Sequence, residues 1–349
     1  MSSIQVTNDA RFRLGRSLMT NGNEGGGASG DSLEGAIDIF AALLGECRKC
    51  GETSLNSALC YYEYGNALFR AVVRQKPLDV DGASNDDGDK KPAAKPAAVA
   101  ARKRSLDDVA NNIKEEPEPD SAPSNKKAKL GDDGVDENDI EEDEDIPLAL
   151  DMLSRSFSIF DLYTSYNDVT KKDPDDEERE LSIAQIPRIL ITIGDIHSYR
   201  GNHGDAVDAY CRALPYREKA VEERKQAKGE SLTVEDLKCQ RLLVETYALI
   251  AESLIACREG EDVVCVNDEE GEDAKMGSKK VLVAAKDRLD FADSHYNMAR
   301  EKLQDIVYQM GKMAAAKIDL AEEKKDIGYL VMMLVGIGDS LESSKKGIS

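Results

Sequence analysis

Two short motifs have residue types and spacing that could do chemistry. Gly25-x-Gly27-x-x-Gly30 matches the glycine spacing of a dinucleotide-binding loop, but such a loop must follow a strand and open a helix to present its N–H groups to phosphate. No strand is predicted before it, so we interpret it as a loop between helices. Cys47-x-x-Cys50 could supply two zinc ligands, but a structural zinc site needs two more ligands, and a redox motif needs a βαβ context. Neither motif predicts a metal or a cofactor.

The three histidines also lack a catalytic pattern. His197 falls at a packing position of a helical repeat, His203 falls in a predicted turn, and His295 lies far along the chain. A nucleophile, a base and an orienting group must meet in space, and nothing in the sequence brings these residues together. We expect a non-enzymatic protein without cofactors, and we expect its seven cysteines to be reduced thiols.

The charge of the chain favours a basic binding partner. The 349 residues include 68 acidic and 46 basic side chains, for a net charge of −22. This balance argues against direct nucleic-acid binding, which needs clustered Lys and Arg, and favours attraction to cationic surfaces. No secretory signal follows Met1, and the longest apolar run, Tyr329 to Gly338, is about half of the ~20 residues that a membrane helix needs. We therefore expect a soluble intracellular protein without membrane contact.

The negative charge is concentrated in one segment. Residues 79–145 contain 21 acidic and 10 basic side chains, a net of −11, together with five prolines. Such a segment cannot bury enough apolar surface to offset chain entropy, so it is predicted to be disordered. Its end is a dense acidic stretch that we interpret as a binding segment for a basic partner: Asp132, Asp133, Asp136, Glu137, Asp139, Glu141, Glu142, Asp143, Glu144 and Asp145.

Two further acidic patches are less dense or shorter. Glu259 to Asp273 has eight carboxylates and no base, and whether this second acidic loop contributes to binding is open. Asp173 to Glu180 is diluted by Arg179, and we interpret it as a solvated loop.

Basic clusters lie inside the acidic segment, in a context predicted to be extended and accessible. Import receptors bind such clusters in an extended chain, so the clusters predict an import receptor as a partner and a nuclear location, with shuttling to the cytoplasm left open. The first has the spacing of a bipartite import signal and the second is shorter: Lys90, Lys91, Arg102, Lys103 and Arg104, then Lys126, Lys127 and Lys129.

The rest of the chain has the apolar spacing of helices. Apolar residues recur every three or four positions, and no useful strand-like alternation is present. A long terminal helix, roughly Ala314 to Ser343, could cap a stack of helices. The other predicted helical segments are Leu55–Val73, Ile146–Tyr163, Ile183–Tyr199, Ala206–Val221, Leu237–Ile255 and Val281–Met310, with a further helix around Ile37 to Leu44.

The helices come in pairs with a repeating pattern of small residues. In the clearest unit, Gly194 lies in a first helix, Gly201 breaks the chain, and Ala206, Tyr210 and Ala213 lie in a second helix. Small residues at this spacing let two antiparallel helices approach closely, as in the 34-residue tetratricopeptide (TPR) repeat. Three degenerate copies fit the same phase: Gly15 with Ala36 and Phe40, Gly65 with Ala149 and Leu153, and Ala251 with Ala292 and Tyr296.

These repeats predict an all-α TPR superhelix, or solenoid, with a C-terminal capping helix and a long acidic insertion. The predicted organisation is residues 1–78, the first repeat and the first helix of the second; 79–145, the insertion with import clusters; 146–260, the rest of the second repeat, the third and the start of the fourth; 261–280, an acidic loop; and 281–349, the end of the fourth repeat and the cap.

A solenoid whose second repeat is split by a long acidic insertion resembles one family. The segments GETSLNSALCYYEYGNALFRAV (51–72), PLALDMLSRSFSIF (147–160), RILITIGDIHSYRGNHGDAVDAYCRAL (188–214) and RLLVETYALIAESL (241–254), with the tail KKDIGYLVMMLVGIGDSLESSKK, carry the resemblance. They are similar to the nuclear autoantigenic sperm protein family of histone chaperones, with its interrupted SHNi-TPR motif. The insertion in the fourth repeat and the position of the basic clusters depart from that pattern.

The resemblance implies an ATP-independent chaperone of histones H3 and H4, with linker histone as a further candidate, that supports chromatin assembly in the nucleus. Histones are rich in Lys and Arg, which an acidic flexible chain can bind reversibly. Whether the chain forms a homodimer is left open. In TPR stacks the concave face is lined by the first helix of each pair, and phasing predicts these groove residues: Tyr62, Asn66, Asp195, Tyr199, Glu245 and Glu252.

A second function class also fits a TPR solenoid. A scaffold or heat-shock co-chaperone would bind peptide termini through a carboxylate clamp, which needs Lys, Arg and Asn on the concave face. Asp195, Glu245 and Glu252 supply the opposite charge there, whereas Arg16 and Arg188 keep this alternative open.

Overall fold

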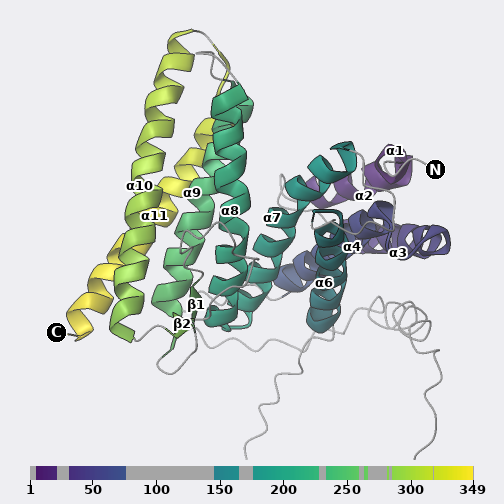
Figure 1. The fold of residues 1–349 in the computed structure, drawn as a ribbon, viewed down its shortest axis with the longest axis horizontal. Helices are drawn as coiled ribbons and strands as arrows, with labels where there is room; N and C mark the ends of the chain where they lie inside the picture. The colour runs from purple at the N-terminus through teal and green to yellow at the C-terminus, as the bar shows by residue number, and fades with distance from the viewer. Residues whose placement is uncertain are drawn as a thin grey trace, which may run out of the picture. The chain divides into compact units, whose positions relative to one another are not determined.

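The computed structural model describes residues 5–21, 31–75, 145–164, 176–227, 233–258, 263–265, 281–282, 285–316 and 318–348 (Figure 1). These residues are almost entirely helical, which confirms the predicted all-α fold class. The elements are α1 (Gln5–Asn8), α2 (Ala10–Asn21), α3 (Asp31–Cys50), α4 (Leu55–Gln75), α6 (Asp145–Thr164), α7 (Asp176–Tyr199), α8 (His203–Ala227), α9 (Val234–Ala256), β1 (Val264–Cys265), β2 (Val281–Leu282), α10 (Ala285–Ala315) and α11 (Ala321–Ile348).

The helices stack in chain order, as expected for a TPR-like solenoid. From α2 to α11, each helix packs against the next one along the chain, and α11 also packs against α9. The pair α4 and α6 packs together although α4 ends at Gln75 and α6 begins at Asp145. Ser156 of α6 donates a buried 2.8 Å hydrogen bond to the backbone oxygen of Ala58 in α4. The long insertion therefore separates two helices of one packed pair.

Glycines at the predicted small-residue positions allow the paired helices to approach closely. A Cβ on Gly194 of α7 would lie 2.6 Å from Cδ1 of Tyr210 in α8. A Cβ on Gly15 of α2 would lie 2.7 Å from Cζ of Phe40 in α3. In each pair a large ring fills the space that the glycine leaves, so the small residue and the ring are complementary halves of one contact.

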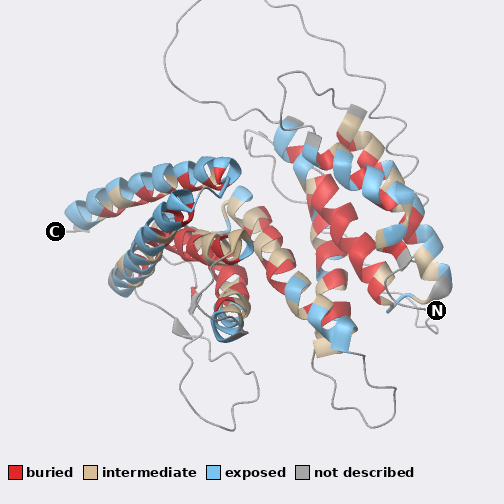
Figure 2. Cartoon of the chain, turned by 90° about the horizontal axis from the view of Figure 1, so that it is seen from above, coloured by how far each residue is buried: buried red, intermediate tan, exposed pale blue. Residues whose placement is uncertain are grey.

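The buried sides of the helices face into the stack (Figure 2), and the buried apolar residues of the described ranges form three clusters there. One cluster of buried residues joins α1 to α7 and includes Phe12, Phe40 and Phe160. A second joins α8 to α11 and includes Tyr247 and Leu303. The outward faces of α10 and α11 are largely exposed (Figure 2). Stacking thus buries apolar surface that no single repeat could bury alone.

Two predicted helix boundaries were wrong. The segment predicted as helical from Val281 does not begin its helix until Ala285, because Val281 and Leu282 pair in antiparallel register with Val264 and Cys265. A short β-hairpin thus precedes α10, and a two-residue strand is too short to produce a visible alternation.

The terminal helix was also placed too early. α10 continues to Ala315, and α11 begins at Ala321 instead of Ala314. Asp319 accepts a 3.1 Å hydrogen bond from the backbone N–H of Ala321, which supplies a partner for one of the unpaired amides at the start of a helix. The apolar spacing alone could not show this break, because buried Met313 and Leu320 lie on either side of it.

Several predictions lie outside the described residues. They include the disordered insertion up to residue 144, most of the acidic loop 261–280 and the glycine-rich loop at 25–30. No helix in the part of the chain that the structure describes is long and apolar enough to cross a membrane.

Candidate functional site

The predicted groove residues lie on three first helices of successive pairs: α4, α7 and α9. Side-chain contacts connect these helices. The ring of Phe69 in α4 meets the ring of Tyr199 in α7 edge to face at 5.9 Å, and the guanidinium of Arg188 in α7 lies 5.6 Å from the ring centroid of Tyr62 in α4. The charges of Glu245 and Glu252 in α9 act on Asp195 in α7. We call this side of α4, α7 and α9 the inner face.

Asp195 is a carboxyl of the inner face with a strongly raised pKa. Burial raises its pKa from 3.8 to about 6, and the negative charges of Glu245 and Glu252 act in the same direction. The hydroxyl of Tyr210 donates a 2.9 Å hydrogen bond to its Oδ1, and this bond together with the charge of Arg70 opposes the rise. Two further carboxylates therefore act on Asp195 on the inner face, and this local negative charge favours the binding of a cation there.

The raised pKa of Asp195 predicts that the free energy of unfolding depends on pH. A carboxyl whose pKa is higher in the folded state binds more protons folded than unfolded, so stability falls as pH rises from 3.8 to about 6. At neutral pH the ionised group opposes folding by about 3 kcal/mol. We expect D195N, which keeps an acceptor for Tyr210, to be more stable than the wild type at neutral pH and to lose this advantage near pH 4. Urea unfolding at several pH values measures the difference; a pH-independent difference would contradict it.

The polar and aromatic groove residues differ in exposure. Tyr62 is only 5% exposed, and burial raises the pKa of its hydroxyl. Asn66 is also buried, and its Oδ1 accepts a 3.3 Å hydrogen bond from Nε of Arg70. Tyr199 is 38% exposed. The ring of Tyr199 is therefore accessible to a partner, whereas the ring of Tyr62 is buried beneath the surface of the inner face.

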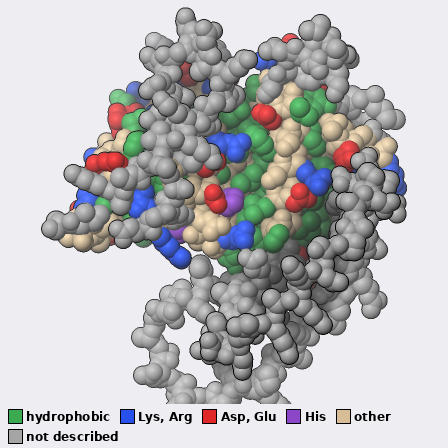
Figure 3. Space-filling model, turned by 60° about the horizontal axis from the view of Figure 1, so that its bottom comes forward, with side chains coloured by type: hydrophobic (Ala, Val, Ile, Leu, Met, Phe, Trp, Pro, Cys, Tyr) green, Lys and Arg blue, Asp and Glu red, His purple; other side chains and the backbone are tan. Residues whose placement is uncertain are grey.

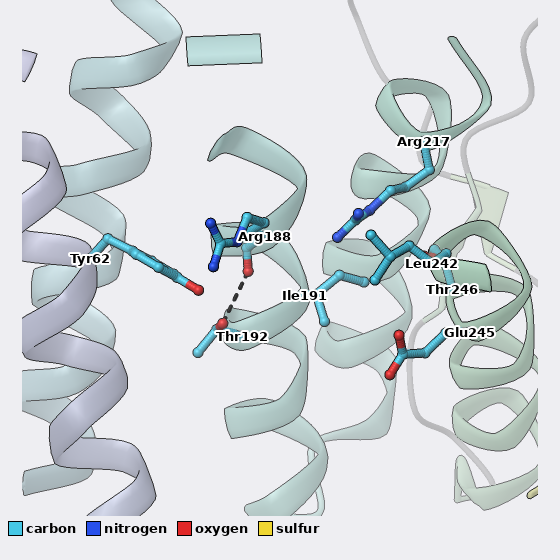
Figure 4. A pocket seen from close by; sticks show the side chains of 8 residues that line it. All are labelled: Tyr62, Arg188, Ile191, Thr192, Arg217, Leu242, Glu245 and Thr246. Carbon is cyan, nitrogen blue, oxygen red and sulfur yellow. Dashed lines mark hydrogen bonds between the residues drawn. The ribbon is translucent and has the colours of Figure 1, made fainter. Parts of the chain in front are cut away.

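A pocket of about 160 Å³ opens on the inner face where three successive repeats meet (Figure 4). Burial lowers the pKa of the Arg217 guanidinium, Glu245 counteracts this effect, and the like charge of Arg188 adds to it. Burial likewise raises the pKa of Glu245, against the charges of Arg241 and Arg217. The lining residues come from α4, α7, α8 and α9: Tyr62, Arg188, Ile191, Thr192, Arg217, Leu242, Glu245 and Thr246.

The sequence did not predict Arg217 as a site residue. Arg217 belongs to α8, the second helix of its pair, whereas the phasing considered only first helices. Glu63 of α4 was missed as well; it is buried and pairs with Arg16 of α2 at 3.2 Å. Basic and acidic side chains are therefore both present on the inner face. One face of the molecule shows both signs interspersed among hydrophobic side chains (Figure 3).

Only one residue of the predicted acidic stretch is described. Asp145 is the first residue of α6 and is 7% exposed. A negative charge at a helix N-terminus interacts favourably with the helix dipole, so Asp145 has a role in α6 itself. The other members, from Asp132 to Glu144, and all eight residues of the predicted import signals lie outside the described residues.

The motifs set aside in the sequence form no chemical centre among the residues that can be described. His197 lies 3.7 Å from Asp205, and burial lowers the pKa of its ring. The Sγ atoms of Cys47 and Cys60 lie 3.9 Å apart, and both are free thiols. No group of three or more His, Cys, Asp or Glu side chains in the described ranges could hold a metal ion.

Comparison with known proteins gives limited similarity. No family model matches the sequence, and no curated protein matches it. Among solved structures, the chain is similar to the yeast histone chaperone Hif1, described as a scaffold protein that recruits protein complexes to core histones. The two are 14% identical with a TM-score of 0.47, over 99% of this chain and 98% of that chain. A likeness of this degree does not transfer a function to this chain.

Proposed function

We propose that this protein is an ATP-independent histone chaperone that binds histones H3 and H4 in the nucleus and supports chromatin assembly. In this proposal the inner face of α4, α7 and α9 supplies specificity. The acidic stretch from Asp132 to Glu144 supplies long-range attraction. An import receptor would bind the basic clusters of the insertion, and linker histone is a further candidate partner. No catalytic step is part of the proposal.

The distribution of negative charge carries the proposal. The chain has a net charge of −22, and half of it falls in the segment inserted between α4 and α6. The helices on either side of this segment lie next to the inner face. Tyr62 and Asn66 are on α4, directly before the insertion, and Asp195 is on α7, the helix after α6. A partner that satisfies both the insertion and the inner-face carboxylates must be strongly basic and must present Lys or Arg to a structured surface. Histones have that chemistry.

The direct test is co-elution of the full-length protein with H3–H4 on a sizing column at near-physiological salt. A stable complex is expected, while lysozyme, a basic protein without histone structure, should elute separately. Failure to bind H3–H4 would overturn the proposal. Equal binding to lysozyme would also overturn it, because the protein would then be a general acidic binder of polycations.

The acidic stretch makes a further prediction about salt dependence. Replacing the carboxylates from Asp132 to Glu144 by Asn or Gln is expected to weaken H3–H4 binding about tenfold at low salt and to flatten the dependence of affinity on salt, because fewer ions are exchanged on binding. Asp145 is kept, since it is buried in α6. Fluorescence anisotropy of labelled H3–H4 over a salt series measures both effects.

The second acidic loop supplies a nearly matched control. Replacing the eight carboxylates of Glu259 to Asp273 changes the net charge by a similar amount. If both variants lose affinity equally, only the total charge matters and the acidic stretch has no special role. Circular dichroism should show unchanged helicity in both variants.

A further inference from the structure

The pocket between the repeats brings Arg188, which the sequence placed on the concave face, together with a second cationic group, Arg217, which the sequence did not predict there. Its lining has two guanidiniums, Arg188 and Arg217, and one carboxylate, Glu245. The Nε atom of Arg217 is buried and has no hydrogen-bond partner among the described residues. An unpartnered buried donor is unfavourable, and more so when it is charged, so the pocket lacks a hydrogen-bond acceptor.

Contacts with its neighbours position Arg188, but they do not use all the hydrogen-bonding capacity of its guanidinium. Its guanidinium lies over the Tyr62 ring at 5.6 Å. Within the described ranges, its Nη1 donates one hydrogen bond, to Oε1 of Gln185. This bond is long, at 3.4 Å. Arg217 extends its guanidinium toward the side of the pocket where Arg188 lies, and the hydroxyl end of Tyr62 points toward Arg188 (Figure 4). The Arg188 guanidinium itself faces Tyr62 (Figure 4), so an oxyanion in the pocket would accept from Arg217 and would be attracted by the charge of Arg188, which reaches Arg217.

The side chains inside the pocket do not supply this acceptor. Thr192 donates its hydroxyl to the backbone oxygen of Arg188 at 3.0 Å, and Thr246 donates to that of Leu242 at 2.8 Å. No hydrogen bond joins Glu245 to Arg188 or Arg217 within the described ranges, although Glu245 acts on Arg217 through its charge. The residues around the arginines leave their N–H groups available to a ligand.

We propose that the pocket lined by Tyr62, Arg188 and Arg217 binds a carboxylate of the partner polypeptide. Glu245 borders both this pocket and the acidic groups around Asp195. A bound segment with an acidic residue close to a basic residue can place its carboxylate beside the arginines of the pocket and its cation beside the carboxylates around Asp195. The identity of the partner rests on the proposed function, whereas the ligand chemistry of the pocket does not. The carboxylate is either an Asp or Glu side chain or a chain terminus.

The sign of one mutational effect tests this proposal with H3–H4. Removing two positive charges should strengthen the binding of a basic partner if the arginines touch no acid, and should weaken it if they bind a carboxylate. We expect R188Q/R217Q to weaken binding about tenfold, equivalent to about 1.4 kcal/mol. K219Q/K225Q removes two exposed charges of α8 and should leave affinity equal or slightly higher. Tighter binding by R188Q/R217Q would overturn the proposal.

A measurement without histones separates the pocket from the proposed function. In the full-length protein, the Nε–Hε NMR signal of Arg217, assigned with R217K, should shift on titration with a blocked Ala-Glu-Ala-Ala tetrapeptide and not with its Gln counterpart. A blocked-N-terminus Ala-Ala-Ala-Ala peptide with a free carboxyl end tests the terminal source of the group. A shift with either carboxylate supports the pocket even if H3–H4 does not bind.

The titration can also fail clearly. If neither carboxylate peptide shifts the Arg217 signal, the pocket does not bind an external carboxylate and the proposal is overturned. This holds whether the pocket binds no carboxylate at all or is already filled by an acidic segment of the same chain. Thermal melting of R188Q/R217Q and R217K checks that the variants fold. R217K keeps the charge but loses the planar fork, so it should bind H3–H4 between the wild type and R188Q/R217Q.

Discussion

Neutralising the inner-face carboxylates with D195N/E245Q/E252Q is expected to weaken H3–H4 binding about 100-fold. Each ionised group would accept a charge-assisted hydrogen bond from a histone Lys or Arg, and removing one partner of such a pair leaves the other charge without compensation. The charges of Glu245 and Glu252 act on Asp195, in addition to the larger effect of burial on its pKa, so the effects of the three substitutions should not be additive. Titration calorimetry at constant salt measures the affinity.

The control variant removes the same charge from elsewhere. E301Q/E322Q/E342Q neutralises three exposed carboxylates of α10 and α11 and should change the affinity less than threefold, because exposed charges act mainly through screened long-range attraction. If both triple variants lose affinity equally, the inner face has no privileged role and the proposed binding mode is wrong.

Substituting the glycine at the tightest helix contact, with G194A, is expected to destabilise the protein by about 3 kcal/mol. The new Cβ would lie 2.6 Å from Cδ1 of Tyr210, so the ring must move or the two helices must separate. Displacing the ring also disturbs the hydrogen bond from the Tyr210 hydroxyl to Asp195. Both effects act on the packing of α7 against α8. Urea unfolding followed by circular dichroism measures the free energy of unfolding.

Gly328 provides the matched substitution. It lies inside α11, and a Cβ there would meet nothing within 4 Å. G328A should therefore stabilise the protein by about 0.5–1 kcal/mol, since alanine loses less backbone entropy than glycine in a helix. If G194A unfolds at the same urea concentration as the wild type, the close approach of α7 and α8 is not required for stability.

In the proposed binding mode, Asp195 of the inner face lowers the stability of the protein and contributes to binding. Ionised Asp195 opposes folding at neutral pH, because burial raises its pKa to about 6. Groups of this kind persist where they serve a function more often than elsewhere. D195N should accordingly raise stability at neutral pH while it lowers the affinity for H3–H4, and the two results together would assign Asp195 to binding.

The sequence alone determined the helical pairs and the small-residue positions at which they approach. A helix returns to the same face every 3.6 residues, so the apolar spacing shows which side is buried. Gly194 and Ala206 indicate where two helices approach closely, because small residues leave room for the partner helix. That the Tyr210 ring fills the room beside Gly194 came from the structure. The charge of the insertion is likewise a property of composition. Local pattern is sufficient for features that depend on one helix and its neighbour.

Only the tertiary structure decided how the inner face is composed. Arg217 reaches the pocket from a second helix, and Tyr62 meets Arg188 from a helix more than one hundred positions earlier in the chain. The pKa of Asp195 depends on burial and on charges from α4 and α9. Periodicity cannot predict these properties, because they arise where side chains of three successive repeats converge, and that convergence depends on how the repeats stack.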